Sequence, residues 1–483
     1  MSSKDIEEVK EKKKFLKIFL ENLNKNCLIY GEYKINFKDL LSYITQINKF
    51  LKENNLEKET IITQIENRFH TFIFYLAAVF SKTTICPLDP KLPLNRVNNI
   101  KKLINAKKII KKIDLSERSL IDIKSLNLRN HNILVTFSSG TSGEPKGIIH
   151  DANSILGISF SYSKLANFNK KTKILHCLPE FYMAGIVNTF FSCLCGSGQV
   201  IIVDSFSKNS IFKIWSDISK YKTNVLYLIP SIYSMITNFS PLNASNIVKK
   251  NKIKFYSTSN NLYPNIRKTF FKKFKTKIQS CYGITEMGGP LSNETKAGLE
   301  YDSVGKLING CKIKIKIINE KRILFFKSIY RCKYLLINNK RKKVQTDKFG
   351  YFDSQDTGFI KNNNIILTGR EKDILKKGGE FIHLKDIENI IIKCNFIEEV
   401  AAVSIENELS DEKLNVYLVL KSKKIRKKNI DYLIKIIKKN MYKTEKPDKI
   451  IFLRQMPKTL SGKIIKRKLL VTNAENKIRE IIL

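Results

Sequence analysis

Short apolar runs alternate with longer amphipathic stretches between about Lys34 and Leu367 of this 483-residue chain. The apolar runs predict buried strands at Ile133–Phe137, Val225–Ile229 and Ile253–Tyr256. The amphipathic stretches predict helices at Phe37–Leu51 and His150–Ala166. Strands that alternate with helices are typical of an α/β fold, in which crossover helices cover a sheet. The pattern therefore predicts a large α/β domain over most of the chain.

The pattern changes after Gly369, where helices and strands are mixed. The expected helices are Leu384–Lys393 and Ile430–Asn440, and the expected strands are Val400–Ile405, Leu414–Leu420 and Ile450–Leu453, followed by a basic tail. A segment of roughly 110 residues is long enough to form a domain of its own. We therefore expect a large α/β domain at residues 1–371 and a small α+β domain at residues 372–483, with the boundary near Arg370–Asp373.

The net charge of +43 is the most unusual feature of the composition. The positive charge is spread along the whole chain and comes mostly from Lys, alongside abundant Ile and Asn. A nucleic-acid-binding protein more often concentrates Arg on one face with interleaved aromatic side chains. We therefore attribute the charge to compositional bias and expect no specific nucleic acid partner. A basic nucleic-acid-binding protein that has lost catalysis remains the alternative from a different class.

Nine cysteines are scattered along the chain without a C-x-x-C pair. An odd number without such a pair argues against a disulfide framework or a zinc site and favours a reducing, cytoplasmic location. Cys193 and Cys195 lie in an apolar stretch and are expected to be core residues. No uncharged apolar run of about 18 residues occurs, so no transmembrane helix is expected. The charged start, Met1–Lys14, does not resemble a signal peptide.

The strongest motif is a segment rich in glycine and hydroxyl groups at Thr136–Gly147, which follows an apolar strand and precedes a helical pattern. Glycines allow a tight loop, while hydroxyls and backbone N–H groups can surround phosphate oxygens. It is not a Walker loop, because Pro145 precedes Lys146. The expected phosphate-binding residues are Thr136, Ser138, Ser139, Gly140, Thr141, Ser142, Gly143 and Lys146.

This segment resembles the phosphate loop of the ANL superfamily, which comprises acyl- and aryl-CoA synthetases, peptide-synthetase adenylation domains and luciferases. Further motifs follow in the family's order, and the resemblance extends from about Ile29 to Leu469. They are Pro87–Arg96, Leu178–Gly185, Tyr282–Glu286, Val304–Lys306, Ser354–Asp356, Gly369–Asp373 with Lys377–Glu380, and Pro457–Lys463. The resemblance implies a large multi-sheet α/β N-terminal domain and a small, mobile α+β C-terminal domain.

The Tyr-Gly-Ile-Thr-Glu motif carries groups that suit a nucleotide. Tyr282 can stack on adenine, Thr285 can donate to the α-phosphate, and Glu286 can hold Mg²⁺ through a carboxylate oxygen. Gly283 lies between them in the motif and is assigned to the same site. Taken alone, the motif could equally be a helix start capped by Thr285.

The resemblance adds residues from other segments to the nucleotide site. It implies that Asp356 accepts both ribose hydroxyls and that Arg370 reaches a ribose hydroxyl or a phosphate. Thr258 and Ser259 occupy the family's adenine-binding segment, where relatives carry glycine or alanine. The chain also departs from the family at Gln355, which replaces a glycine beside Asp356.

The C-terminal motif supplies the expected catalytic lysine, Lys463. The resemblance implies that Lys463 bridges the attacking carboxylate and the phosphoryl oxygens, where a cation stabilises the negatively charged transition state. It also implies that Lys372 is the hinge between two domain orientations. Gly378 and Gly379 are then expected to line a tunnel for the arm that carries the thiol.

The expected pocket for the acid contains Tyr182, Met183 and Gly185. Tyr182 stands where many relatives carry histidine. Domains that activate amino acids usually carry an Asp here for the ammonium group, and this chain offers only Glu180, whose neighbour Pro179 favours a structural role. The segment therefore favours an acyl or aryl acid over an amino acid.

Together these motifs predict an ATP-dependent ligase with Mg²⁺ and coenzyme A as cofactors. The enzyme is expected to activate a carboxylic acid as an acyl-adenylate, release pyrophosphate and transfer the acyl group to a thiol. Free coenzyme A is the expected acceptor, and the phosphopantetheine of a separate acyl carrier protein is the alternative.

Overall fold

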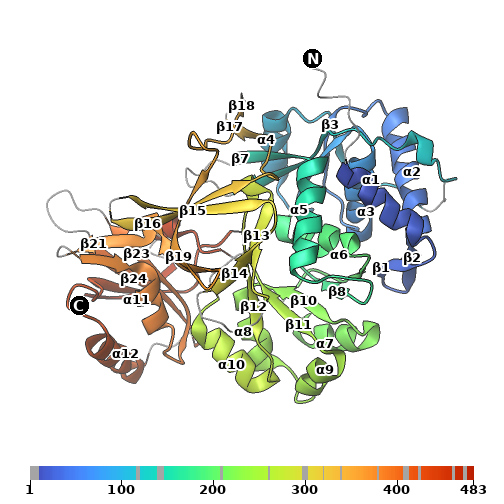
Figure 1. The fold of residues 1–483 in the computed structure, drawn as a ribbon. Coiled ribbons are helices and arrows are strands. Elements are labelled where there is room, and N and C mark those ends of the chain that lie inside the picture. The colour runs from blue at the N-terminus through green and yellow to red at the C-terminus, as the bar shows by residue number, and fades with distance from the viewer. Residues whose placement is uncertain are drawn as a thin grey trace.

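The structure is a computed structural model that describes residues 10–115, 120–138, 146–206, 210–258, 262–295, 303–318, 320–337, 340–377, 380–405, 413–422, 426–459, 463–471 and 476–482. Two large sheets with their covering helices form the N-terminal part, and two small sheets lie toward the C-terminus, at the left of Figure 1. The expected fold class, a multi-sheet α/β region followed by a small α+β domain, is confirmed.

The larger sheet has thirteen strands, of which β1 and β8–β12 pair in parallel and the others mainly antiparallel. In sheet order they are β15 (Cys311–Ile318), β16 (Lys321–Ser328), β19 (Phe352–Lys361), β20 (Asn364–Arg370), β14 (Ser303–Leu307), β13 (Gly289–Asn293), β12 (Ile278–Ile284), β11 (Lys254–Ser257), β10 (Val225–Leu228), β8 (Lys173–His176), β9 (Gln199–Ile202), β1 (Asn26–Tyr30) and β2 (Tyr33–Asn36).

The parallel strands are buried on both faces, which explains their continuous apolar sequences. Leu226 and Leu228 of β10 pack against one core cluster, and Val225 and Tyr227 pack against another. Four helices cover the first face: α7 (Ser210–Tyr221), α8 (Pro230–Phe239), α9 (Ala244–Asn251) and α10 (Pro264–Phe274). The strands expected at Val225–Ile229 and Ile253–Tyr256 are therefore confirmed as β10 and β11.

The second sheet has seven strands and carries the glycine-rich segment. Its order is β18 (Lys340–Lys342), β17 (Tyr334–Ile337), β7 (Lys146–Asp151), β6 (Asn132–Ser138), β4 (Thr84–Pro87), β3 (Thr60–Thr63) and β5 (Lys108–Ile110). The strand expected at Ile133–Phe137 is confirmed as β6.

The helix expected at His150–Ala166 was placed two residues too early. His150 and Asp151 belong to β7, and the helix is α5 (Ala152–Leu165), with the Asp151 carboxylate accepting the Ser154 N–H at 2.8 Å as its N-cap. The glycine-rich segment therefore connects two antiparallel strands and does not lead directly into a helix. The cause is tertiary, because β7 is held between β6 and β17, and β17 lies nearly 190 residues later in the chain.

The main hydrophobic core lies between the two large sheets and draws on strands from both. Its helical elements are α1 (Lys10–Glu21), α2 (Phe37–Glu53), α3 (Arg68–Phe80), α5, the π-helical η3 (Ala184–Phe191) and α6 (Ser192–Cys195). The helix expected at Phe37–Leu51 is confirmed as α2, and Cys193 and Cys195 are buried in α6 as expected. The remaining short elements of this part are α4 (Leu94–Ile104), η2 (Ile123–Ser125) and η4 (Thr285–Met287).

The C-terminal part begins after η5 (Glu371–Asp373) with the hairpin β21 (Ile374–Lys377) and β22 (Glu380–His383). A four-stranded sheet follows, with helices: α11 (Leu384–Ile391), β23 (Ile397–Ile405), β24 (Lys413–Leu420), α12 (Lys427–Asn440), β25 (Lys449–Leu453), α13 (Lys466–Leu469) and β26 (Lys477–Ile482). All five elements expected here are confirmed. The expected basic tail instead contains β26, which pairs with β25.

No helix in the described residues is long and apolar enough to cross a membrane.

Candidate active site

Asp356 lies at the centre of the candidate site, where β19 pairs with β20. Its side chain is 9% exposed; Oδ1 lies 3.0 Å from Nε of Arg370, and Oδ2 accepts the hydroxyl of Tyr282 at 2.5 Å. Burial raises the pKa of Asp356, although Arg370, the Tyr282 hydroxyl and Lys463 each act to lower it. Each carboxylate oxygen still has a lone pair for a further donor, so Asp356 can accept hydroxyl groups of a ligand.

The turn before Asp356 explains how the carboxylate is aimed. Gln355 adopts a left-handed conformation with φ of 57°, which is a conformation that favours glycine. The Ser354 hydroxyl accepts the Asp356 N–H at 3.0 Å and donates to the carbonyl of Leu324 at 2.6 Å. The Gln355 N–H donates to Asp353 at 2.8 Å. The turn is thus held by hydrogen bonds although Gln355 carries a side chain in a conformation that favours glycine.

The Tyr-Gly-Ile-Thr-Glu motif runs from the end of β12 into η4. Gly283 is required by packing, because a Cβ atom there would lie 2.5 Å from the carbonyl oxygen of Gly289. Thr285 and Glu286 are half-buried and follow directly in η4. The Glu286 carbonyl accepts the Cys332 N–H at 2.9 Å, which fixes the backbone.

The carboxylate of Glu286 makes no hydrogen bond or ion pair within the part of the chain that the structure describes, so it is available to a ligand. No group of three or more His, Cys, Asp or Glu residues that could hold a metal occurs among the described residues. Mg²⁺ commonly uses one or two protein carboxylates together with phosphate oxygens and water. Glu286 therefore fits a magnesium ion that arrives with a nucleotide.

Lys463 approaches the same point from the C-terminal part of the chain. Its side chain keeps contact with solvent, but surrounding protein atoms desolvate the amine and lower its pKa. Arg370 lowers the pKa further, while the carboxylates of Asp356 and Glu286 oppose the shift. Backbone contacts with Thr459 hold Lys463 in place: its N–H donates to the Thr459 hydroxyl at 3.1 Å, and its carbonyl accepts the Thr459 N–H at 2.8 Å.

The phosphate-loop residues are only partly described. Thr136 is buried in β6, and its hydroxyl has no hydrogen-bond partner among the described residues. Ser138 and Lys146 pair across β6 and β7 at the base of the loop. The expected residues that lie outside the described ones are Ser139, Gly140, Thr141, Ser142, Gly143, Ser259, Gly378 and Gly379.

Lys372, the expected hinge residue, lies in η5 between β20 and β21. This position joins the last strand of the large sheet to the first strand of the C-terminal part.

Thr258, from the expected adenine-binding segment, is buried at the end of β11 beside Cys281.

The residues expected to form the acid pocket lie immediately before η3 and at its start. Tyr182 and Met183 are half-buried, and a Cβ atom at Gly185 would lie 2.3 Å from the carbonyl oxygen of Pro179. The packing around residue 185 therefore requires a glycine, whether or not a substrate contacts it. A Cβ atom at Gly289 would lie 3.4 Å from Met183 Cε, and Val187 lies within 4 Å, so these side chains form one apolar wall.

The sequence places Val187 in the apolar stretch that follows Gly185, but sequence reasoning missed Gly289. The adjacent glycines Gly288 and Gly289 are the only signal in the sequence that could have pointed to it, and both adopt a positive φ in the structure.

Glu180 has a structural partner, as the sequence suggested. Its carboxylate lies 2.9 Å from Nε of Arg68, and the side chains are 7% and 9% exposed. Arg68 also donates to the carbonyls of His176, Leu178 and Val203. Nothing in the sequence identified Arg68, which comes from α3 more than 100 residues away.

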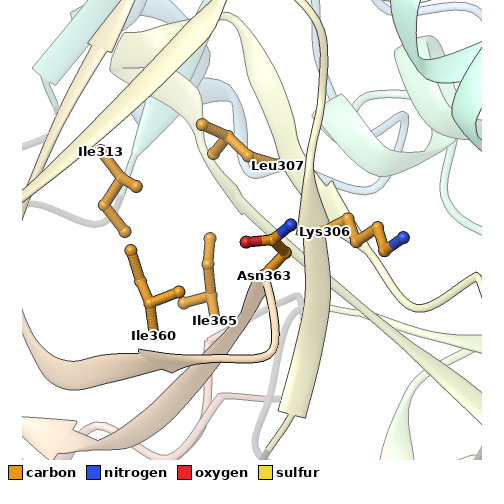
Figure 2. A pocket seen from close by; sticks show the side chains of 6 residues that line it. All are labelled: Lys306, Leu307, Ile313, Ile360, Asn363 and Ile365. Carbon is orange, nitrogen blue, oxygen red and sulfur yellow. The ribbon is translucent and has the colours of Figure 1, made fainter.

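A separate pocket of about 320 Å³ opens between β14, β15 and the turn that joins β19 to β20 (Figure 2). It is lined by Leu307, Ile313, Ile360, Ile365, Lys306 and Asn363. The apolar side chains gather on one side of Asn363, and Lys306 extends to the other (Figure 2). Because Ile360 and Ile365 pair at the opposite end of the hairpin from Asp356 and Arg370, this pocket is distinct from the candidate site.

Family profiles match both the N-terminal and the C-terminal part of the chain. The profile of the AMP-binding enzyme family matches residues 122–324, and that of the AMP-binding enzyme C-terminal domain matches residues 386–463. Together the two matches cover more than half of the chain.

Individual relatives are distant. The long-chain-fatty-acid–CoA ligase FadD13 of Mycobacterium tuberculosis is 23% identical over 350 residues, which cover 69% of this chain and 66% of the relative. The oxalate–CoA ligase of Saccharomyces cerevisiae is 24% identical, with 71% of this chain and 63% of the relative covered. The matched region thus spans about two thirds or less of the length of these curated relatives.

The fold extends further than the sequence similarity. The crystal structure of ATP-bound MatB from Rhodopseudomonas palustris superposes with a TM-score of 0.80 at 16% identity, covering 95% of this chain and 98% of that chain. The profile matches and the ordered motifs lead to one assignment: the chain belongs to the ANL superfamily of adenylate-forming enzymes.

Proposed function

We propose that this protein uses ATP to activate a carboxylic acid as an acyl-adenylate, with release of pyrophosphate, and then transfers the acyl group to the thiol of coenzyme A. The observation that carries the proposal is the convergence of Lys463 with Asp356, Arg370 and Glu286, which come from distant parts of the chain. When a carboxylate attacks a phosphate, negative charge builds up in the transition state. A cation placed among the nucleotide-binding groups stabilises that charge.

In the proposed first step, Asp356 and Arg370 hold the ribose and Tyr282 contacts the adenine. Thr285 and Lys146 bind phosphate oxygens, and Glu286 would hold Mg²⁺, which neutralises charge on the phosphates when bound. The substrate carboxylate attacks the α-phosphorus, and the bond from that phosphorus to the α,β-bridging oxygen breaks, so that pyrophosphate leaves with this oxygen. Lys463 stabilises the charge that builds on the equatorial oxygens, so no protein nucleophile is required.

In the proposed second step, the thiol attacks the carbonyl carbon of the acyl-adenylate. A thioester forms, the carbon–oxygen bond to the phosphate breaks, and AMP leaves. We propose a domain boundary at residues 371 and 372, so that the C-terminal domain can turn about Lys372 and withdraw Lys463. Gly378 and Gly379 would then line the path of the thiol.

We propose an acyl or aryl acid as the substrate class. The wall made by Met183, Val187 and Gly289 is apolar, which favours burial of a hydrocarbon or aromatic group. Glu180 is paired with Arg68 and does not offer a free carboxylate to an ammonium group. The names of the relatives, which include ligases for a long-chain fatty acid and for oxalate, span too wide a range to choose a chain length.

The test is pyrophosphate release with Mg²⁺, ATP and a panel of fatty, aromatic, dicarboxylic and amino acids. We expect release with at least one fatty or aromatic acid, together with a hydroxamate when hydroxylamine traps the adenylate. A folded protein that releases pyrophosphate with no acid would contradict the proposal. Release with amino acids alone would contradict the substrate class only.

The thiol that accepts the acyl group and the alternative of a nucleic-acid-binding protein are tested in separate experiments. Free coenzyme A and a phosphopantetheine-bearing carrier protein, offered at equal concentration, distinguish the proposed acceptor from its alternative. Tight nucleic acid binding at physiological salt would favour the nucleic-acid-binding class, whereas a diffuse cation loses such binding steeply as salt rises.

We also propose a cytoplasmic location. All nine cysteines are free thiols, and eight of them are buried, as expected for a protein in a reducing compartment.

A further inference from the structure

One buried carboxylate in the C-terminal domain contacts three separate parts of the structure. Glu388 lies on α11 and is 6% exposed. Its Oε1 accepts the backbone N–H of Ala402 at 2.9 Å and lies 3.0 Å from Nζ of Lys466, while its Oε2 accepts the hydroxyl of Tyr263 at 3.1 Å. A buried carboxylate with three donors is fully engaged, so each donor is held in a fixed position.

Tyr263 belongs to the large domain and immediately precedes α10. Its ring packs against the hydrophobic core of the C-terminal domain, and desolvation and the charge of Glu388 raise its pKa well above the usual value. Two residues later, the side-chain amide of Asn265 donates to the carbonyl of Ile392 at the end of α11, at 3.3 Å. Tyr263 and Asn265 thus join the start of α10 to the middle of α11 and to its C-terminal end.

Lys466 extends the same network to the hinge and to the catalytic lysine. Its Nζ lies 3.2 Å from Asp373, which is the residue after Lys372. Although burial alone would lower the pKa of Lys466, the carboxylates of Glu388 and Asp373 raise it, so the amine stays charged. Lys466 is three residues after Lys463 in the chain, and therefore the position of Glu388 fixes the segment that places Lys463 in the site.

We infer that Tyr263 is a positioning residue that holds the C-terminal domain in the orientation with Lys463 in the active site. The inference rests on the proposed two-step function and adds to it a specific contact that sets the balance between the two orientations. The contact must break for the domain to turn about Lys372, because Tyr263 remains with the large domain while Glu388 moves. A strong contact would favour adenylation, and a weak one would favour the thioester-forming orientation.

The test is to replace Tyr263 by Phe, which keeps the packing and removes only the hydroxyl. A hydrogen bond to a charged group shifts an equilibrium by about tenfold or more. We expect adenylation, measured as pyrophosphate release with hydroxylamine as the trap, to slow by about that factor. Thioester formation from a supplied acyl-adenylate should be unchanged or faster. Tyr33→Phe, at an exposed tyrosine of β2, is the matched control and should alter neither rate.

A second variant, Asn265→Ala, removes the neighbouring interdomain hydrogen bond. Like Tyr263→Phe, it should slow adenylation and leave thioester formation unchanged or faster. The inference is overturned if Tyr263→Phe alters both half-reactions equally or alters neither. Hydrogen–deuterium exchange over residues 384–392 provides a measure that needs no activity: exchange should be faster in Tyr263→Phe than in the wild type and in Tyr33→Phe. If exchange is unchanged in Tyr263→Phe, the inference is overturned, even if no acid is activated. If the wild type does not release pyrophosphate, only the proposed function is overturned.

Discussion

At the scale of single residues, Lys463 and Asp356 each depend on groups from distant parts of the chain. Asp356 is buried and would be protonated more readily than usual, but Arg370 and Tyr282 occupy both of its oxygens. Lys463 is desolvated, yet two carboxylates face it. In each case groups of opposite charge act against the effect of burial on the pKa, so the two side chains are coupled electrostatically.

Replacing Lys463 by Ala should separate the two half-reactions. The variant loses a cation that is needed only during adenylation, so pyrophosphate release should fall by about 10²- to 10³-fold, as for loss of one group that stabilises a transition-state charge. Conversion of a supplied acyl-adenylate to the thioester should be retained. Lys439→Ala, on the exposed end of α12, is the control for loss of one positive charge. Equal loss of both half-reactions would exclude this role for Lys463.

Gln355 offers a test of backbone strain beside the site. A residue other than glycine in the left-handed region costs roughly 1 kcal/mol, which a glycine avoids. Gln355→Gly should therefore raise the free energy of unfolding by about 1 kcal/mol or slightly less, since glycine also gains entropy in the unfolded chain. Denaturant unfolding measures the difference. Gln355→Ala keeps the strain and should give no gain, so similar stability of the two variants would argue against this explanation.

At the scale of elements, the sequence predicts strands and helices well where local pattern and tertiary environment agree. β10 and β11 are continuous apolar runs because helices and core cover both of their faces. β7 was not predicted as a strand, and its last two residues were assigned to the helix that follows, since only its neighbours β6 and β17 make it a strand. β26 was expected to be a charged tail for the same reason: its pairing with β25 is not visible in a basic sequence.

The residues of the candidate site also fall into two groups, those that the sequence identifies and those that only the fold identifies. Tyr282, Asp356, Arg370 and Lys463 stand in motifs whose chemistry can be recognised from residue type and order. Arg68 and Tyr263 could not be identified, because their contacts span more than 80 residues of chain. Motifs therefore predict the groups that we propose to touch the nucleotide, whereas the residues that position those groups can be identified only from the fold.

Helix α1 provides a prediction about pH. Lys12 is fully buried, and burial lowers its pKa from 10.5 to about 7 against the opposing charge of Asp151. Its amine donates to the carbonyl of Asn127 at 2.9 Å and lies 3.2 Å from Nδ1 of His131. Between pH 7 and pH 10.5 Lys12 is protonated in the unfolded chain but largely deprotonated in the folded protein. Because the unfolded state binds more protons, the free energy of unfolding should rise with pH in that window.

Lys12→Met removes this titration. The free energy of unfolding of the wild type, taken relative to the variant, should rise by about 1.4 kcal/mol per pH unit across the middle of that window and level off below pH 7. Chemical denaturation at several pH values measures the difference, and other titrating groups cancel between the two proteins. A difference that does not vary with pH would mean that Lys12 is not desolvated as the structure indicates.

At the scale of the whole molecule, the site is assembled from two parts of the chain that meet at the residues around Lys372. In the proposed mechanism Lys463 lies against the α-phosphate during adenylation, and a thiol later reaches the carbonyl carbon of the acyl-adenylate. One fixed arrangement cannot serve both steps. In the described arrangement Lys463 interacts electrostatically with Asp356 and Glu286, which supports the proposal that this is the adenylating orientation.

Lys372→Pro is therefore expected to keep the first half-reaction and lose the second. Proline fixes φ near −65° and stiffens a hinge, which works by changing a few backbone angles. Pyrophosphate release trapped by hydroxylamine should stay within about twofold of the wild-type rate, because the domain already lies in the adenylating orientation, while thioester formation should fall by at least about tenfold. Lys372→Ala, which leaves φ free, should retain both half-reactions and so separates loss of flexibility from loss of the side chain. If the proline variant is folded and forms thioester at the wild-type rate, the hinge lies elsewhere, and the domain must turn about a different residue between β20 and β21.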